Sequence, residues 1–341
     1  MSFSRLATVS VLLAGLAAAD IDAVKQAAER VRQLSEKAPG SLGAEFRAMA
    51  AKSLQPRYPD LANQLSPPAP PATPRPAMPA GGPRPVPPPE LAAIQKSIGQ
   101  MRGLPTDDDR ARLVLETTTA IRALPAGIAK LGPAYSLSNL VTEGDLGKDA
   151  LNAVAATLTL ALRESPASAA GYIQLARLVR YEHATPPPPN PALDAAIAVL
   201  ALRDEMLQNA GFTLTGLDGK SYALDGLRGH VVLLNFWATW CPPCRKEMPD
   251  MEKLYRQFEK QGLVVLAVSD EKRETVEKYL AERHYSFPIL LDPDRKVNDT
   301  FSVEGIPKSF LFDRQGKLAA QAIDMRTERQ FLEMFRSAGL E

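Results

Sequence analysis

Cysteine is nearly absent from this sequence: its 341 residues include only two, Cys241 and Cys244. A small secreted domain cross-linked by disulfides needs more cysteines than that. A structural zinc site needs four ligands, and none of the three histidines, His183, His230 and His284, stands at ligand spacing to the cysteine pair. The scarcity of cysteine therefore excludes a disulfide framework, argues against zinc, and leaves a redox pair as the main interpretation.

An excess of charge of one sign and long apolar runs are lacking as well. The 40 basic and 39 acidic residues give a formal net charge of +1, which is not the clustered positive charge of a nucleic-acid-binding protein. No run approaches the roughly 18 consecutive apolar residues of a membrane-spanning helix. We therefore expect no nucleic-acid partner, and a peripheral contact with a membrane only through an uncleaved N-terminus.

The N-terminus has the organisation of an export signal. Arg5 supplies a weak positive region, and residues 6–19 form an uncharged run of 14 residues that is too short to span a bilayer. Ala17-Ala18-Ala19, followed by Asp20, fits a cleavage site between small residues. The alternative is an ordinary buried first helix. We favour a signal peptide over residues 1–19, and so expect an exported, periplasmic or extracytoplasmic protein rather than a cytoplasmic one.

A helical segment and a proline-rich linker come next. Apolar residues recur at helical spacing in residues 20–64. Residues 65–89 are rich in proline, and such a segment cannot bury enough apolar surface to fold. We expect an extended, semi-rigid spacer there, with recognition by a partner's aromatic groove as the alternative.

Residues 90–209 are predicted to form an α-helical domain, either a small bundle or a few helix pairs. Three polar residues mark predicted helix starts, because Thr106 precedes three aspartates and Ser165 and Asn190 each precede a proline. The block holds no cluster of His, Asp or Glu and no glycine-rich loop. The sequence therefore assigns it no chemistry, and a binding or scaffolding role stays open.

Residues 210–341 change to a succession of strand and helix patterns. Short apolar runs on either side of Asp218-Gly219 predict a β-hairpin. The nearly continuous apolar run 231–237 is typical of a buried strand, and a helix is predicted after it over 241–259. The later elements are predicted at 263–268 (strand), 271–282 (helix), 287–291 (edge strand), 309–312 and 318–323 (hairpin), and after Thr327 (helix). This order predicts an α/β domain whose mixed sheet is covered by helices on both faces.

The two cysteines stand where the buried strand gives way to a helix. The N-terminus of a helix carries partial positive charge and free N–H groups, which stabilise a thiolate at Cys241. That thiolate attacks a disulfide, and Cys244, one turn further on, resolves the mixed disulfide. Pro242 and Pro243 are tolerated between them because N–H groups of a first turn have no intrahelical partner. A CxxC motif in this setting indicates thiol–disulfide exchange.

Residues 211–341 resemble thioredoxin-like proteins of the TlpA/ResA type. The segments that carry the resemblance are Leu217-Asp218-Gly219-Lys220, residues 227–249 around Trp240-Cys241-Pro242-Pro243-Cys244, Gly305-Ile306-Pro307, and Phe310-Leu311-Phe312-Asp313. The resemblance implies a thioredoxin fold, and protein-disulfide reductase activity with no cofactor beyond a redox-active Cys241–Cys244 disulfide. Its partners would be protein thiols or disulfides and an upstream electron donor.

The resemblance also implies roles for individual residues. Pro307 is expected to be cis and to line the groove where a substrate strand docks, and Cys241 is expected to be the exposed nucleophile. Trp237 is expected in the core. The expected substrate-binding residues are Trp240, Pro242, Pro243, Ile306 and Pro307.

Glu247 is the third expected catalytic residue, after the two cysteines. It matches an acidic residue that is proposed to manage protons in ResA-like proteins. Ordinary thioredoxins have a buried aspartate on the strand before the motif, and Asn235, which cannot exchange a proton, stands at that position here. We therefore expect Glu247 to assist deprotonation of Cys244. The alternative is a solvated glutamate that stabilises the helix N-terminus.

The sequence thus predicts a thiol–disulfide oxidoreductase that acts as a reductant, although the direction depends on its potential relative to that of its compartment. One alternative is a peroxiredoxin-like antioxidant of the AhpC/TSA type, which would need a Pro-x-x-x-Thr-x-x-Cys setting that neither cysteine has. Another is a helical binding or scaffold protein that carries a redox domain.

Overall fold

The computed structural model describes residues 21–66, 87–104, 106–140, 143–165, 168–208, 210–322 and 325–341. The export signal and nearly all of the proline-rich linker lie outside the described residues and stay predictions. The chain divides into two compact units, with the division between Arg203 and Asp204. No helix within these ranges is both long and apolar enough to cross a membrane.

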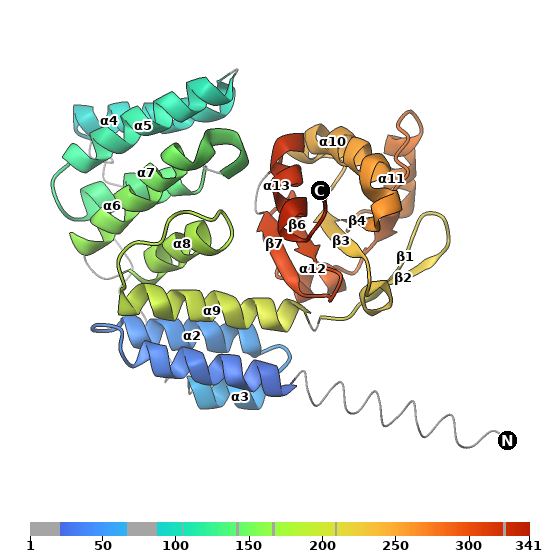
Figure 1. Cartoon of the computed structure of the whole chain (residues 1–341), viewed down its shortest axis with the longest axis horizontal. Helices are drawn as coiled ribbons and strands as arrows, with labels where there is room; N and C mark the ends of the chain where they lie inside the picture. Colours follow the sequence, from blue (N-terminus) through green and yellow to red (C-terminus); the bar gives the residue numbers. More distant parts are fainter. Residues whose placement is uncertain are drawn as a thin grey trace, which may run out of the picture. The chain divides into compact units, whose positions relative to one another are not determined.

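The first unit is built of helices (Figure 1). Residues 21–35 are helical, and the further helices are α2 (Leu42–Leu54), α3 (Pro59–Leu65), α4 (Pro89–Gln100), α5 (Asp107–Ala123), α6 (Ile128–Ser138), α7 (Glu143–Arg163) and α8 (Ala169–Arg180), with a 3-10 turn at Met101–Gly103. The last helix, α9 (Pro191–Gln208), begins in the first unit, and its residues from Asp204 onward belong to the second. Both α5 and α6 pack against α7, and α4 packs against α5. Short connections between antiparallel helices give the helix pairs that the sequence predicts.

Two of the predicted helix starts are confirmed by their hydrogen bonds. The Thr106 hydroxyl accepts from the Asp109 N–H at 3.0 Å at the start of α5. The Asn190 side-chain oxygen accepts from the Ala192 N–H at 2.9 Å at the start of α9. Each bond satisfies one of the N–H groups that a helix leaves unpaired at its N-terminus.

The third predicted start is wrong. Helix α8 is capped by Ser168, whose hydroxyl accepts from the Gly171 N–H at 3.2 Å. The hydroxyl of Ser165 instead donates to the carbonyl oxygen of Gly127 at 2.9 Å. Ser165 is occupied by this distant partner, and the second serine caps the helix.

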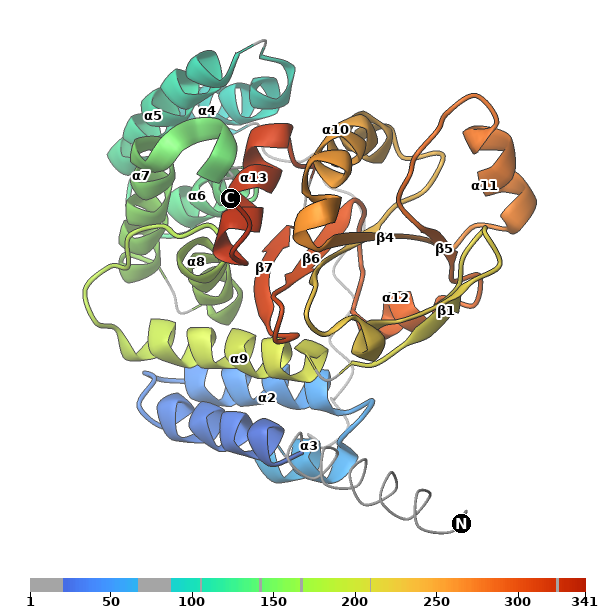
Figure 2. The same cartoon turned by 45° about the vertical axis from the view of Figure 1, so that its right-hand side comes forward.

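A five-stranded mixed sheet forms the centre of the second unit, in the order β5-β4-β3-β6-β7. Figure 1 labels β3, and Figure 2 labels the other four strands. The central strand β3 (Val231–Phe236) runs parallel to β4 (Leu263–Ser269) and antiparallel to β6 (Lys308–Phe312). The outer strands are β5 (Ile289–Leu291), predicted as an edge strand, and β7 (Leu318–Ala322). The sheet therefore has the mixed character that the sequence predicts.

The remaining elements surround this sheet. They are the antiparallel strands β1 (Thr213–Thr215) and β2 (Ser221–Ala223), the helices α10 (Pro242–Phe258), α11 (Arg273–Leu280), α12 (Lys296–Thr300) and α13 (Glu328–Ser337), and 3-10 turns at Leu224–Leu227 and Glu259–Gln261. The hairpin around Asp218-Gly219 is thus confirmed, and α13 begins with the predicted capping box at Thr327. The short helix α12 is not predicted from the sequence.

Both outer strands have partners beyond the sheet. The Leu217 N–H, just after β1, donates to the Ile289 carbonyl of β5 at 2.9 Å. On the other side, the Leu318 N–H of β7 donates to the side-chain oxygen of Gln208 at 3.2 Å. Both Gln208 and Asp204 belong to the last turn of α9, and the buried carboxylate of Asp204 accepts from the Gln321 amide at 2.9 Å.

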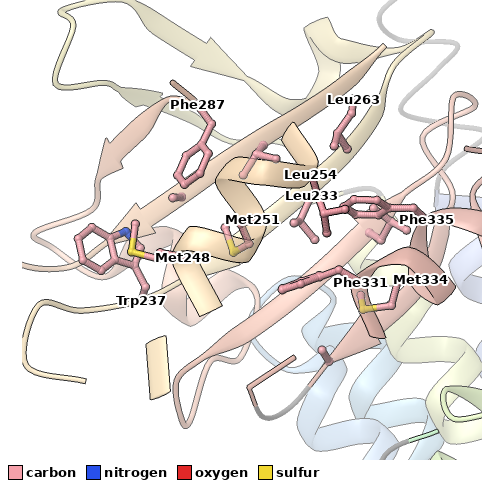
Figure 3. Close-up of a cluster of buried hydrophobic side chains, with 14 of the residues drawn as sticks. Leu233, Trp237, Met248, Met251, Leu254, Leu263, Phe287, Phe331, Met334 and Phe335 are labelled. Carbon is pink, nitrogen blue, oxygen red and sulfur yellow. The ribbon is translucent and has the colours of Figure 1, made fainter. Parts of the chain in front are cut away.

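Side chains of β3 alternate between two hydrophobic cores. Val231 and Leu233 face the core formed with α10 and α13, while Val232, Leu234 and Phe236 face the core on the α12 side. Both faces are buried, which explains why the strand reads as a continuous apolar run. Figure 3 shows the first core, in which the labelled side chains are Leu233, Trp237, Met248, Met251, Leu254, Leu263, Phe287, Phe331, Met334 and Phe335.

An aromatic cluster centred on Phe301, directly after α12, forms the second core. The centroid of its ring lies 5.1 Å from that of Phe310, 5.8 Å from Phe236, 6.0 Å from Phe212 and 6.4 Å from Phe312. Aromatic pairs in such tilted and edge-on arrangements stabilise a core beyond the area they bury. Helix α12, which the sequence did not predict, therefore places Phe301 in contact with both the hairpin region and the sheet.

Candidate active site

The two cysteines form a disulfide at the start of α10. Cys241 is the N-cap residue, Cys244 lies in the first turn, and their Cα atoms are 5.3 Å apart. The Cys244 N–H donates to the Sγ atom of Cys241 at 3.2 Å. Pro242 and Pro243 occupy the first two helical positions between them. An N–H aimed at this sulfur, at the positive end of a helix, stabilises negative charge on Cys241 once the pair is reduced.

Cys241 is only 2% exposed in the disulfide form, so the expectation of an exposed nucleophile is wrong for this form. The cause is a segment distant in sequence: the carbonyl oxygen of Ile306 lies 3.9 Å from the Sγ atom of Cys241. Cys241 also belongs to the same buried cluster as Trp237 and Met248. The Ile306 segment thus limits the approach to the reactive sulfur.

The expected docking residues differ in exposure. The Ile306–Pro307 peptide bond is cis, as expected, and Pro307 is buried while Ile306 is half-buried. Trp240 is 67% exposed, and Pro242 is exposed on the first turn of α10. The structure therefore brings Ile306 next to Cys241 and leaves an indole ring in solvent one residue before that cysteine.

Glu247 is 1% exposed, so the alternative of a solvated glutamate is wrong. Its Oε1 atom accepts from the amide Nδ2 of Asn235 at 2.8 Å, and its Oε2 atom accepts from the backbone N–H of Arg326 at 3.0 Å. The same Nδ2 atom donates to the Ser309 hydroxyl at 3.0 Å. Strand alternation explains this contact, because Asn235 shares a face of β3 with Leu233 and so points toward α10.

Sequence reasoning missed four residues near the motif: Thr239, Glu271, Ser309 and Arg326. Ser309 becomes the register partner of Asn235 only once β3 and β6 are paired. The other three carry no local pattern, since they meet their partners only through the fold.

Trp237 lies in the core, as expected (Figure 3). Its ring centroid is 5.6 Å from that of Tyr279. Burial and the neighbouring Tyr279 raise the pKa of Tyr285 to about 12. Tyr285 therefore stays protonated at neutral pH. Across the described ranges, no group of three or more His, Cys, Asp or Glu side chains is placed to hold a metal ion.

Comparison with known proteins agrees with this site. A family model described as the AhpC/TSA family matches residues 207–321. The thiol-disulfide oxidoreductase ResA of Bacillus cereus is 39% identical over 120 residues, which cover 35% of this chain and 69% of that protein. This chain belongs to the ResA family of thiol-disulfide oxidoreductases.

A second relative and a solved structure match the same part of the chain. The ResA of Halalkalibacterium halodurans is 36% identical over 133 residues, which cover 38% of this chain and 76% of that protein. Among solved structures, the pneumococcal exposed lipoprotein thioredoxin Etrx1 of Streptococcus pneumoniae is 28% identical, with a TM-score of 0.35, covering 37% of this chain and 98% of that one. The predicted thioredoxin-like fold, the TlpA/ResA resemblance and the oxidoreductase activity are confirmed for the second unit by the family match and the ResA relatives.

Proposed function

We propose that the chain reduces disulfides of client proteins through Cys241 and Cys244. The observation that carries this proposal is the disulfide at the start of α10, with the Cys244 N–H aimed at the Sγ atom of Cys241. In the reduced form, the Cys241 thiolate attacks a client disulfide, a new S–S bond forms, and one client sulfur leaves as a thiolate. The Cys244 thiolate then attacks Cys241, which releases the second client sulfur and re-forms the internal disulfide.

The pair passes two electrons to the client, so a separate donor must restore the dithiol. No other cofactor is required for this cycle. We propose that clients dock on Trp240, Pro242, Pro243, Ile306 and Pro307, a choice supported by the exposed Trp240 ring and by the 3.9 Å separation between the Ile306 carbonyl and the Cys241 sulfur. We also propose that exchange takes place outside the cytoplasm, on the strength of the export signal predicted over residues 1–19.

A glutathione titration of the full chain tests the direction of electron flow. We expect a reduction potential for Cys241/Cys244 more negative than about −200 mV, in the direction of the reductant thioredoxin at about −270 mV, together with catalytic reduction of insulin. The reduced fraction is measured by alkylation and mass spectrometry. A potential near that of a strong oxidant, about −120 mV, would contradict the proposed direction.

Glu247 is proposed to accept the proton of Cys244 during the resolving step. Its carboxylate is buried one turn after Cys244 on the same helix and is held by donors from Asn235 and Arg326. A positioned carboxylate of this kind accelerates proton transfer when it is within reach of the reacting group or of a bridging water.

Glu247→Gln is expected to slow the resolving step by about tenfold or more, because a glutamine cannot take up the proton. The variant is expected to fold, since the buried Asn235 Oδ1 atom has no hydrogen-bond partner and a flipped Asn235 amide can present it to the new amide group. Stopped-flow exchange measured against pH checks the prediction. Glu259→Gln, at the exposed far end of α10, is the control. A wild-type rate and pH profile in Glu247→Gln would remove Glu247 from the mechanism.

The AhpC/TSA match favours a second candidate, reduction of a peroxide by Cys241. In that chemistry Cys241 alone performs the first step, and Cys244 only restores it afterwards. Rapid single-turnover consumption of hydrogen peroxide by Cys244→Ser would support a peroxidase.

A further inference from the structure

One carboxylate accepts two hydrogen bonds from the turn that precedes Cys241. The Thr239 N–H donates to the Oε2 atom of Glu271 at 2.6 Å, and the Thr239 hydroxyl donates to the Oε1 atom at 2.7 Å. Glu271 follows β4, and its Oε2 atom accepts a further hydrogen bond from the Ser269 hydroxyl at 3.3 Å. Hydrogen bonds to an ionised group are about twice as strong as those between neutral groups. Thr239 is therefore firmly attached to the end of β4.

The neighbouring backbone bonds show what this attachment fixes. The Trp237 N–H donates to the Val268 carbonyl at 3.0 Å and so extends the β3–β4 pairing to the start of the turn. The Cys241 N–H donates to the Ala238 carbonyl at 3.1 Å and closes the turn around Thr239. The position of Cys241 thus depends on a turn whose middle is held by a side chain from the next strand.

We propose that Glu271 is a positioning residue that keeps Cys241 beside Cys244 while the pair is reduced. This inference rests on the proposed function, in which the pair alternates between disulfide and dithiol. In the disulfide form, the S–S bond itself keeps the two residues together. In the dithiol form that bond is gone, and Glu271 holds the turn in the geometry from which the disulfide re-forms.

The expected consequence is that Glu271 favours the disulfide form over the dithiol form. Without Glu271, the dithiol form gains conformational freedom that the disulfide form cannot gain, so the dithiol becomes relatively more stable. In the glutathione equilibrium, the two protein thiols give two electrons and two protons to oxidised glutathione, which yields the protein disulfide and two reduced glutathione molecules. The equilibrium constant for this reaction is expected to fall when the hydrogen bonds between Thr239 and Glu271 are lost.

The experiment measures that constant in the full chain by thiol labelling. Glu271→Ala is expected to lower it about tenfold, which raises the reduction potential by about 30 mV. Thr239→Val, which removes only the hydroxyl donor, is expected to lower it about threefold, while Thr239→Ser, which keeps both donors, stays at the wild-type value. Asp270→Ala is the matched control, because the adjacent carboxylate pairs with Arg295 instead of Thr239.

Two results would overturn the proposal. The first is a wild-type constant in Glu271→Ala or, if that variant does not fold, in Thr239→Val. The second is a lower constant in Glu271→Ala together with a wild-type constant in Thr239→Val. That result would assign the effect to the charge of Glu271 rather than to its hydrogen bonds with Thr239. The constant is independent of any client, so a chain that fails to reduce insulin but shows the graded shifts would refute only the proposed function.

Discussion

Cys241→Ser is expected to abolish insulin reduction, with a loss of about a thousandfold or more, the size typical of removing a nucleophile. Only a thiolate attacks a disulfide at useful rates, and the serine hydroxyl stays protonated at neutral pH. The Cys244 N–H that donates to the Cys241 sulfur would then face an oxygen that does not react with a client. Release of free thiols from insulin, followed by a colorimetric reagent, checks the result.

Cys244→Ser is expected to fail at a different point of the same cycle. Cys241 still attacks, but no resolving thiol follows it on α10, so the chain stops after one event as a covalent adduct with its client. Mass spectrometry under non-reducing conditions detects this adduct, and dithiothreitol should release it. Steady turnover by Cys244→Ser at the wild-type rate would show that the resolving thiol comes from elsewhere, and would contradict the proposed cycle.

Phe301→Ala is expected to lower the free energy of unfolding of the second unit by about 3–5 kcal/mol. Phe301 is 1% exposed, and its ring packs against four other phenylalanines from the hairpin region, β3 and β6. An alanine would leave a cavity that these rigid rings cannot fill. Both tryptophans of the chain, Trp237 and Trp240, lie in the second unit, so their fluorescence in a urea titration reports on this unit.

Phe301→Leu is the matched control, because it keeps most of the volume and is expected to cost only about 1–1.5 kcal/mol. A loss below about 1 kcal/mol in Phe301→Ala would mean that the aromatic cluster collapses around the gap, or that it contributes little to stability. Activity measured below the unfolding transition should stay near the wild-type level, since Phe301 is on the opposite face of the sheet from α10.

The parts of the fold that the sequence predicts are those with a strong local signal. The apolar run of β3 and the capping box at Thr327 each depend on residues that are neighbours in the chain. Helix α12 shows why other parts are missed. It is five residues long, it follows Arg295 in a left-handed conformation with φ of 59°, and the N–H groups of Val297 and Asn298 donate to the carboxylate of Asp292, five and six residues before them in the chain. No periodicity can reveal a single turn held in this way.

The candidate site likewise has parts with a local sequence signal and parts that depend on distant residues. The cysteine pair is local, and its position at a strand–helix junction predicts the chemistry. Its exposure is not local, because a segment 65 residues further along the chain covers Cys241. The buried setting of Glu247 likewise depends on Asn235 and Arg326, which lie 12 and 79 residues away. Glu271 meets Thr239 across 32 residues. Spacing patterns therefore find the cysteine pair, whereas the groups packed around it can be named only from the structure.

The bonds made by both outer strands bear on how the sheet avoids unwanted association with other chains. An unpaired strand edge is a template on which any extended polypeptide can add, and it is a common start of aggregation. Here Leu217 bonds to β5 on one side, and Gln208 takes the Leu318 N–H of β7 on the other. Each bond occupies one backbone group of an outer strand, so fewer groups are left at either edge of the sheet for an added polypeptide.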